Sequence, residues 1–255
     1  MPPERQTILG KTIVLTGAAG GIGDRLARLL VERGADVVGI DRIASPSATT
    51  SRQVDLGDEA ECAKLCESLS ADPPDILINL AGVMSFGLHA AADPALIALC
   101  YRVNLVVPAL LSQAVAGPMR ARGSGRIVNI GSMLGAIPYP WFAVYSSSKA
   151  GLAALSQALR RELADSGVHV THVAPRAART PFNSGEVDRF LAVMGMSADD
   201  PEAVARRIAD AICRGEDSVA IGRMERLYAR INALAPRLID AGLRRQIKLA
   251  HKQFP

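Results

Sequence analysis

The stretch TGAAGGIG, from Thr16 to Gly23, stands between two segments of different periodicity. Before it, residues 12–16 read TIVLT, a short β-branched run typical of a buried parallel strand. After it, apolar residues recur at helical spacing and form one stripe of a helix that ends at Gly34. The sequence therefore predicts a glycine-rich connection between a strand and a helix.

Three glycines, Gly17, Gly21 and Gly23, indicate what this loop can bind. Glycine permits a tight turn and lets the backbone approach a pyrophosphate, and the start of the helix offers free N–H groups and the positive end of its dipole. A bare glycine pattern is also compatible with an ordinary loop. The strand before it and the helix after it favour dinucleotide binding.

Asp41 ends the next predicted strand, 18 residues after Gly23. An acid at this point accepts hydrogen bonds from the ribose hydroxyls of NAD and repels the 2′-phosphate of NADP. Arg42 beside it is a cation that can accommodate such a phosphate, and Asp41 can also be read as a plain turn residue. With the glycine loop upstream, the pattern favours NAD over NADP.

Strand and helix patterns alternate along the rest of the body, which indicates repeated βαβ units. The fold class is α/β: a single doubly wound (Rossmann) domain over residues 1–222, with a seven-stranded parallel sheet, helices on both faces and a C-terminal helical extension over 223–255. Residues 176–200 are predicted to be irregular. The strands are expected at residues 12–16, 35–41, 51–55, 75–82, 125–132, 168–175 and 217–222. The helices of the body are expected at residues 22–34, 58–69, 95–119, 144–167 and 201–215.

Composition excludes several other classes of protein. Of the 255 residues, 49% are hydrophobic and 21% charged, which suits a folded core, and the 4% of aromatics argues against a base-stacking nucleic-acid binder. Four cysteines make neither a disulfide framework nor a paired zinc site. The start lacks a signal-like apolar region, and no run approaches the roughly 20 apolar residues of a spanning helix. We expect a soluble protein of a reducing compartment, the cytoplasm, with no metal and no nucleic-acid partner.

Tyr145 and Lys149 open the predicted helix at 144–167, four residues apart and hence on one face. A phenol near pKa 10 is a poor acid–base catalyst at neutral pH, and a neighbouring cation brings its pKa closer to that range. Ser132 lies at the carboxyl end of the strand predicted at 125–132, at the sheet edge where open α/β folds bind ligands. An isolated pair of this kind is more often a surface tyrosine and a solvated lysine.

The pair is not isolated, because six pieces occur in a fixed order over about residues 8–222. These are the glycine loop at 16–23, Asp55, the N-x-A-G segment at 79–82, Asn104, Ser132, and Tyr145 with Lys149. In this order the chain resembles the short-chain dehydrogenase/reductase family. Two places depart from the family pattern: Leu80 replaces an asparagine, and Arg176 replaces the glycine after Pro175.

The resemblance implies a role for each matching residue. Tyr145 is the expected acid–base, Lys149 binds the nicotinamide ribose and lowers the pKa of the tyrosine, Ser132 positions the reacting oxygen, and Asn104 holds a water. Asp55 is expected at adenine and Thr180 at the nicotinamide carboxamide. The full set of expected cofactor contacts is Gly17, Gly21, Ile22, Gly23, Asp41, Asp55, Leu56, Asn79, Ala81, Gly82, Tyr145, Lys149, Pro175 and Thr180.

The resemblance also implies an activity, hydride exchange with a secondary alcohol or ketone. The segments expected to line the substrate pocket are mostly apolar, which favours a hydrophobic substrate. The alternative is a catalytically idle dinucleotide-binding sensor or scaffold, against which the complete set of catalytic residues argues. The pocket residues are Met133, Leu134, Ile137, Pro138, Tyr139, Pro140, Trp141, Phe142, Phe182, Phe190, Leu191, Met194 and Met196.

Three features are left open at this point. Arg176 and Arg179 lie near the expected nicotinamide end, where solvent exposure or an ion pair is the plainer explanation. The helix at 95–119 carries more apolar residues than one buried stripe needs, so we expect a homodimer or homotetramer. The third feature is the tail.

The C-terminal extension, residues 223–255, holds most of the positive charge. It has eight Lys/Arg against two acidic residues, whereas the body is slightly acidic and the whole chain has a net charge of +4. Its helical stripe consists of Leu227, Ile231, Leu234 and Leu238, and Pro236 predicts a kink or break. The stripe can pack on the body or on a sister subunit. It can also lie on an anionic membrane surface.

Overall fold

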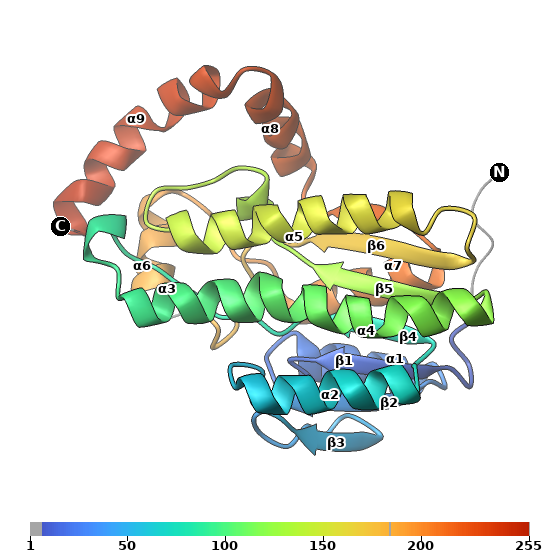
Figure 1. Cartoon of the computed structure of the whole chain (residues 1–255). Helices are drawn as coiled ribbons and strands as arrows, with labels where there is room; N and C mark the ends of the chain where they lie inside the picture. Colours follow the sequence, from blue (N-terminus) through green and yellow to red (C-terminus); the bar gives the residue numbers. More distant parts are fainter. Residues whose placement is uncertain (1–6, 184, 255) are drawn as a thin grey trace.

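In the computed structural model, which describes residues 7–183 and 185–254, seven parallel strands form one sheet in the order β3-β2-β1-β4-β5-β6-β7. The chain starts in the middle of the sheet, moves to one edge, returns across β1 and continues to the other edge (Figure 1). This is the predicted doubly wound arrangement. The strands are β1 Thr12–Thr16, β2 Asp36–Asp41, β3 Thr50–Gln53, β4 Ile76–Asn79, β5 Gly125–Ile130, β6 Val168–Ala174 and β7 Ser218–Ala220.

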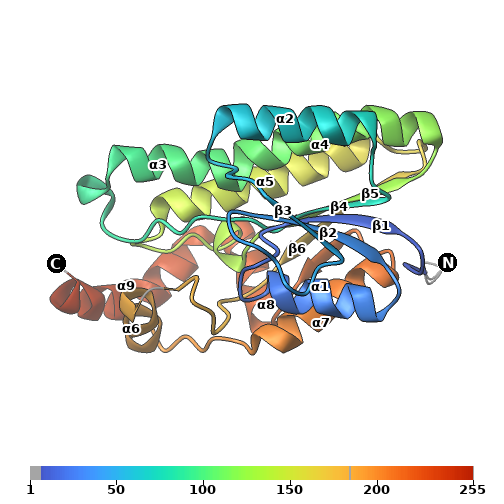
Figure 2. The same ribbon diagram turned by 90° about the horizontal axis from the view of Figure 1, so that it is seen from below.

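Helices cover both faces of the sheet, as Figure 2 shows edge-on, with α2, α4 and α5 on one face and α1 and α7 on the other. Alternate residues of β1 pack into the cores on the two sides of the sheet, because successive side chains of a strand point to opposite faces. Ile13 and Leu15 pack in the core under α1 and α7, and Val14 packs in the core under α2 and α4. These helices are α1 Gly23–Glu32, α2 Glu59–Ala71, α4 Val107–Arg122, α5 Ala143–Glu162 and α7 Pro201–Cys213.

The long apolar helix predicted at 95–119 is divided in the structure. It consists of α3, Pro94–Tyr101, a π-helical turn, Arg102–Val106, and α4. Single π turns inside α-helices occur frequently at functional sites, since they shift the side chains that follow them. Asn104 lies within this turn and is completely buried.

Residues 94–122 also correct an expectation from the sequence. Among the residues that the structure describes, this helical run is long and apolar enough to cross a membrane by length and composition, although we expected no such run. In the fold, α4 packs against α2, and α3 packs against α5. A helix that covers the sheet of an α/β protein can be as long and as apolar as a helix that spans a membrane.

The segment 176–200 is more regular than predicted. It contains α6, Gly185–Val193, which buries Val187, Phe190 and Leu191. Helical spacing of these three residues was present in the sequence, but the helix is short and its contacts are made with distant parts of the chain. Phe190 touches Phe86 and Trp141 at ring-centroid distances of 5.4 and 5.2 Å.

The C-terminal extension forms two helices, α8 Arg223–Leu234 and α9 Pro236–Gln253, that arch away from the body in Figure 1. The predicted break occurs at Ala235, and Pro236 is the first residue of α9, where proline has no N–H to lose. Three residues of the predicted stripe remain exposed: Leu227 by 49%, Leu234 by 88% and Leu238 by 65%. The body therefore leaves these three side chains largely uncovered, and packing on a sister subunit or contact with a membrane stays a prediction.

Candidate active site

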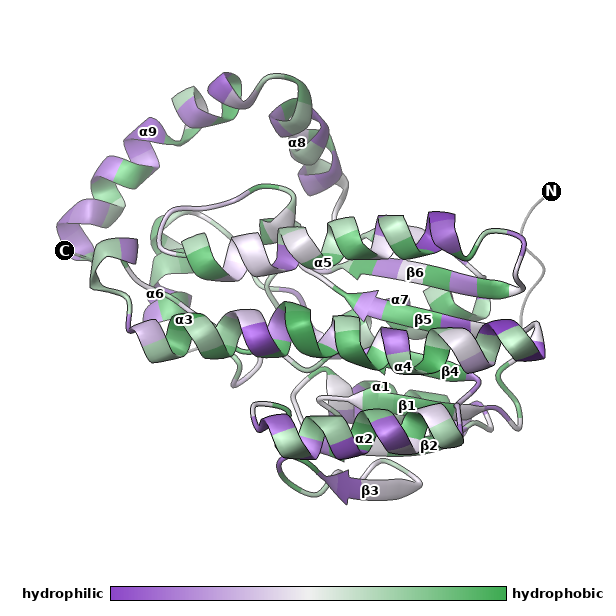
Figure 3. Cartoon of the chain, viewed as in Figure 1, coloured by the Kyte–Doolittle hydropathy of each residue, from purple (hydrophilic) through white to green (hydrophobic). Residues whose placement is uncertain are grey.

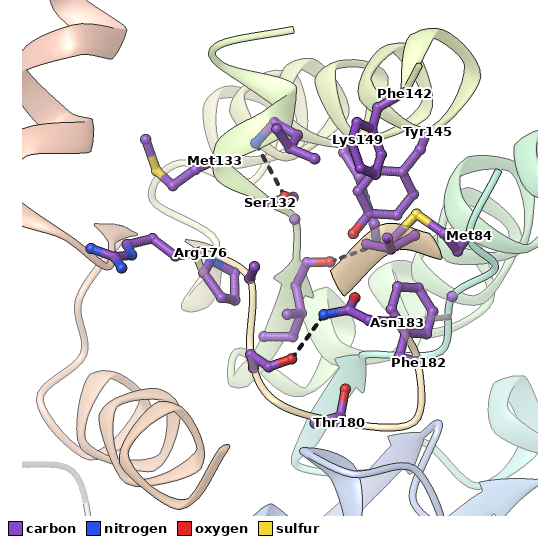
Figure 4. Close-up of a pocket in the computed structure, with 18 of the residues that line it drawn as sticks. Met84, Ser132, Met133, Phe142, Tyr145, Lys149, Arg176, Thr180, Phe182 and Asn183 are labelled. Atoms are coloured by element: carbon purple, nitrogen blue, oxygen red, sulfur yellow. Dashed lines mark hydrogen bonds between the residues drawn. The ribbon is translucent and has the colours of Figure 1, made fainter. Parts of the chain in front are cut away.

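A cavity of about 1240 Å³ extends along the carboxyl ends of the strands and continues beneath the arch. Figure 4 shows the part around Ser132 and Tyr145, with Thr180 and Phe182 lying across from them. One half is lined by the glycine loop and by polar strand ends, and the other half mostly by apolar side chains. The division corresponds to a cofactor half and a substrate half.

The glycine loop has the backbone geometry that its sequence predicts. Gly17 has a φ of +72°, and a Cβ there would lie 2.8 Å from the backbone of Ala81. A Cβ on Gly23 would collide with the carbonyl of Gly17, and one on Gly21 would lie 2.6 Å from the Thr180 side chain. The loop thus leaves a cradle at the start of α1 that only glycine keeps open, and a dinucleotide pyrophosphate fits it.

Asp41 lies at the end of β2 and lines the cofactor half. Its carboxylate accepts hydrogen bonds from the backbone N–H groups of Ala19, at 3.0 Å, and Arg42, at 2.7 Å. The first of these bonds ties the carboxylate to the glycine loop. Each carboxylate oxygen has a second lone pair, so the fixed group can still accept bonds from ribose hydroxyls.

Most other expected cofactor contacts also line this half: Ile22, Asp55, Leu56, Ala81, Gly82, Pro175 and Thr180. Asn79 does not. Asn79 is 2% exposed and its side chain donates to Asn129 Oδ1 at 2.8 Å within the core, so this side chain does not face the cavity, and the expected contact near the adenine ribose stays a prediction. The neighbouring turn is held by Thr16, whose Oγ1 accepts from the N–H groups of Leu80 and Ala81, both at 3.1 Å.

Tyr145 lies in the first turn of α5 with its side chain buried at the boundary between the two halves. Burial raises the pKa of the phenol to about 12, and a hydrogen bond with Ser132 lowers this pKa in part. The lowering of the tyrosine pKa that the sequence analysis expects from Lys149 is not seen: burial dominates, because a buried site disfavours the phenolate. At neutral pH the phenol carries its proton.

Lys149 lies one turn further along α5, with its Nζ 5.9 Å from the centre of the Tyr145 ring. The ammonium donates to the carbonyl of Ile130, at the end of β5, at 3.0 Å. Burial lowers the pKa of Lys149 to about 8, so it is still mostly protonated at neutral pH. The site therefore holds one buried cation beside one neutral phenol.

Ser132 follows β5 and begins a short 3₁₀ turn, where its Oγ accepts a hydrogen bond from the N–H of Leu134 at 3.1 Å. This bond fixes the hydroxyl next to the phenol of Tyr145, with which it also shares a hydrogen bond. The two hydroxyls face the cavity from different elements, one after β5 and one on α5. They form a pair to which one carbonyl or carbinol oxygen can bind.

Asn104 is buried behind the wall of the cavity and does not line it. Its side chain accepts from the N–H of Val83 at 2.7 Å and donates to the carbonyl of the same residue at 2.9 Å. Its amide also lies 3.1 Å from Ser148 Oγ, on α5. These bonds join the π turn, the loop after β4 and α5, and so hold Lys149 and Gly82 in place.

The two arginines near the nicotinamide end have structural partners. Arg176 forms ion pairs with Glu225 at 2.9 Å and Asp199 at 3.4 Å, and so joins the loop after β6 to α8. Arg179 donates to the carbonyl of Ala198 at 2.6 Å. The replacement of the usual glycine by Arg176 thus serves to attach the tail.

The substrate half is apolar, as the sequence indicated, but its lining differs in part. Trp141 and Phe190 belong to the core beneath it and do not line it, and Pro138 and Pro140 do not line it either. Sequence reasoning missed the contribution of the tail, because no local pattern shows which part of the body a helix faces. The tail residues that line the cavity are Glu225, Tyr228, Ile231, Leu238, Ile239, Gly242, Leu243 and Gln246.

Several known proteins are similar to this chain in sequence and in structure. The family model described as short chain dehydrogenase matches residues 11–189. The ketoacyl reductase HetN of Nostoc sp. is 30% identical, over 92% of this chain and 88% of that protein. A short-chain dehydrogenase from Sphingobium yanoikuyae, solved with NADPH, is 27% identical with a TM-score of 0.76, over 90% of this chain and 96% of that one.

A further solved structure is the bulky-bulky ketone specific alcohol dehydrogenase from Comamonas testosteroni. It is 25% identical with a TM-score of 0.74, and the match covers 90% of this chain and 94% of that one. The family model matches most of the chain, and the fold agrees with that of the similar solved structures. The chain therefore belongs to the short-chain dehydrogenase family of oxidoreductases.

Proposed function

We propose that this protein is an NAD(H)-dependent oxidoreductase that interconverts a hydrophobic secondary alcohol and its ketone. The observation that carries the proposal is the placement of Ser132 and Tyr145 together in the lining of the cavity, where a dinucleotide cradle meets an apolar half. The likeness to a ketoacyl reductase and to an alcohol dehydrogenase for bulky ketones supports both the reaction and a hydrophobic substrate.

Each residue has a part in the reaction that follows from its position. The bound nicotinamide supplies or accepts the hydride. The phenol of Tyr145 donates its proton to the forming alkoxide in reduction and accepts it back in oxidation. Ser132 orients the substrate oxygen, and the ammonium of Lys149 favours negative charge on the tyrosine oxygen during transfer.

The alternative function is an idle dinucleotide-binding sensor or scaffold. Such a protein needs the glycine loop and Asp41. It does not need the hydroxyls of Ser132 and Tyr145 in the lining of an apolar cavity. Burial of the Tyr145 phenol and the Lys149 ammonium costs stability, because each loses hydration. A chain that keeps both groups in this arrangement is better explained as an enzyme.

A screen tests this proposal directly. The purified chain is mixed with NAD or NADH and a set of secondary alcohols and ketones of graded apolar size, and absorbance of the reduced nicotinamide is followed. We expect turnover with bulky apolar members of the set and little with sugars. Absence of turnover with every member, despite measured cofactor binding, would favour the sensor.

We also propose that the protein is a homo-oligomer, a homodimer or homotetramer, in the cytoplasm. The apolar run from α3 to α4 leaves three large side chains partly exposed that do not line the cavity: Tyr101, Val106 and Leu110, each by 36–42%. Cys62, Cys66, Cys100 and Cys213 are free thiols, which suits a reducing compartment.

The oligomer prediction is tested by light scattering at micromolar concentration. We expect a dimer or tetramer for the unaltered chain, and a shift toward monomer for Val106→Glu/Leu110→Glu, because two carboxylates then replace apolar contacts. Leu9→Glu is the matched control, since Leu9 is 70% exposed and lies elsewhere. A monomer for the unaltered chain contradicts the prediction.

A further inference from the structure

The arch, defined as α8, Ala235 and α9, carries large apolar side chains that the body leaves uncovered. Leu234, at the end of α8, is 88% exposed, and Leu227, two turns earlier on the same stripe, is 49% exposed. Neither side chain lines the cavity. Exposed leucines on a helix that is otherwise held to the body need a further contact to bury them.

The same arch is strongly cationic. Seven of its basic side chains are exposed: Arg226, Arg230, Arg237, Arg244, Arg245, Lys248 and Lys252. The only exposed acid in this part of the described chain is Asp240, because Glu225 is paired with Arg176. In Figure 3, hydrophilic and hydrophobic residues alternate along both helices, and in the sequence Arg226 and Arg237 stand directly before Leu227 and Leu238. Among the residues that the structure describes, no ion pair joins any of the seven to an acid of the body.

The exposed surface of the arch is continuous with the substrate half of the cavity. Tyr228 and Leu238 are 45% and 65% exposed and also line the cavity. Ile231 lines the cavity one turn from Leu234. The arch therefore forms an apolar mouth whose outer rim is basic and whose inner side leads toward Tyr145.

We propose that the arch docks on an anionic lipid bilayer and that the hydrophobic substrate enters the cavity from that bilayer. An amphipathic helix with leucines on one face and cations beside them is typical of segments that lie in the membrane interface. A second copy of the chain fits this surface poorly, because a two-fold contact would bring two sets of seven cations together. The part that concerns the substrate rests on the proposed function, whereas the docking does not.

Vesicle sedimentation of the full chain tests the docking. We expect binding to vesicles of phosphatidylglycerol and phosphatidylcholine, weaker binding at high salt, and little binding to vesicles of phosphatidylcholine alone. Each cation near an anionic surface changes the partition about fivefold, so Arg230→Glu/Arg237→Glu should weaken binding about 25-fold or more. Each buried leucine contributes about tenfold, so Leu227→Asp/Leu234→Asp should have a comparable or larger effect.

Matched variants keep this test specific to the arch. Lys64→Glu/Arg161→Glu reverses two exposed cations on α2 and α5, and Leu9→Asp introduces a carboxylate at an exposed leucine of the body. Both should sediment like the unaltered chain. Equal binding to neutral and anionic vesicles, or equal weakening by the control variants, would overturn the proposal. So would a chain that binds neither vesicle, which would leave an acidic protein as the partner that fits the arch.

A second measurement separates docking from catalysis. With a long-chain secondary alcohol dissolved in anionic vesicles, Leu227→Asp/Leu234→Asp should lose about tenfold or more of the turnover. With a short, water-soluble alcohol the same variant should match the unaltered chain. Vesicle binding without turnover of any alcohol would leave the docking intact and reject the proposed function. Equal turnover of the vesicle-borne alcohol by both proteins would reject entry from the bilayer.

Discussion

Tyr145→Phe is expected to lower the turnover number by about 10²–10⁴-fold, the usual loss when a general acid–base is removed. The phenyl ring keeps the packing of the tyrosine, which is buried and lies 6.2 Å from the ring of Phe182. Only the hydroxyl and its bond with Ser132 are lost. Initial rates with the best alcohol and ketone from the screen measure the effect.

Cofactor affinity and a second tyrosine serve as controls for this prediction. Binding of NAD should change little, because the glycine loop and Asp41 are untouched. Tyr101→Phe also removes one hydroxyl, which lies 2.7 Å from Ser147 Oγ on the surface of α5, and should retain activity. Retention of most activity by Tyr145→Phe would remove this tyrosine from the mechanism.

A second expected result is a preference for NAD over NADP that depends on Asp41. The carboxylate faces the cofactor half, fixed by the N–H groups of Ala19 and Arg42, and would meet the 2′-phosphate of NADP with like charge. Such a juxtaposition costs on the order of several kcal/mol, or about 100-fold in affinity. Asp41→Asn removes the charge with little change of shape and should reduce the preference about tenfold or more.

Calorimetric titration with both dinucleotides measures this preference. Asp36→Asn removes an exposed carboxylate at the opposite end of β2 and should leave the ratio of affinities unchanged. Arg42 is adjacent to Asp41 and is the cation that could bind the 2′-phosphate of NADP. Equal or tighter binding of NADP by the unaltered chain would show that the cation outweighs the carboxylate.

Most of the cofactor half could be predicted from the sequence, because its chemistry depends on short-range features. Gly17 needs a positive φ, and the spacing of Tyr145 and Lys149 puts them on one helix face whatever surrounds them. The direction of the Asn79 side chain could not be predicted in this way. Its place at the end of the fourth strand is visible in the sequence, but its side chain turns into the core because it bonds to Asn129 of the neighbouring strand.

The pKa of Tyr145 shows the limit of local reasoning more clearly. From the sequence, Lys149 is the neighbour that matters, and it lowers the pKa of the phenol. In the folded chain burial raises this pKa to about 12, because residues from distant segments exclude water from the ring. Desolvation depends on everything that surrounds a group, so a spacing of four residues cannot reveal it.

By itself, the sequence determined the α/β class, the parallel sheet, the glycine cradle and the position of Tyr145 and Lys149 on one helix face, since each depends on periodicity or on residues close together in the chain. Only the tertiary structure decided that Asn104 lies in a buried π turn, that Arg176 is paired with Glu225, and that the tail forms the mouth of the cavity. The physical reason is the separation along the chain between the residues that interact. Amphipathic helices show which faces are apolar, but whether Leu234 is covered or left in water depends on contacts with segments far away in the chain.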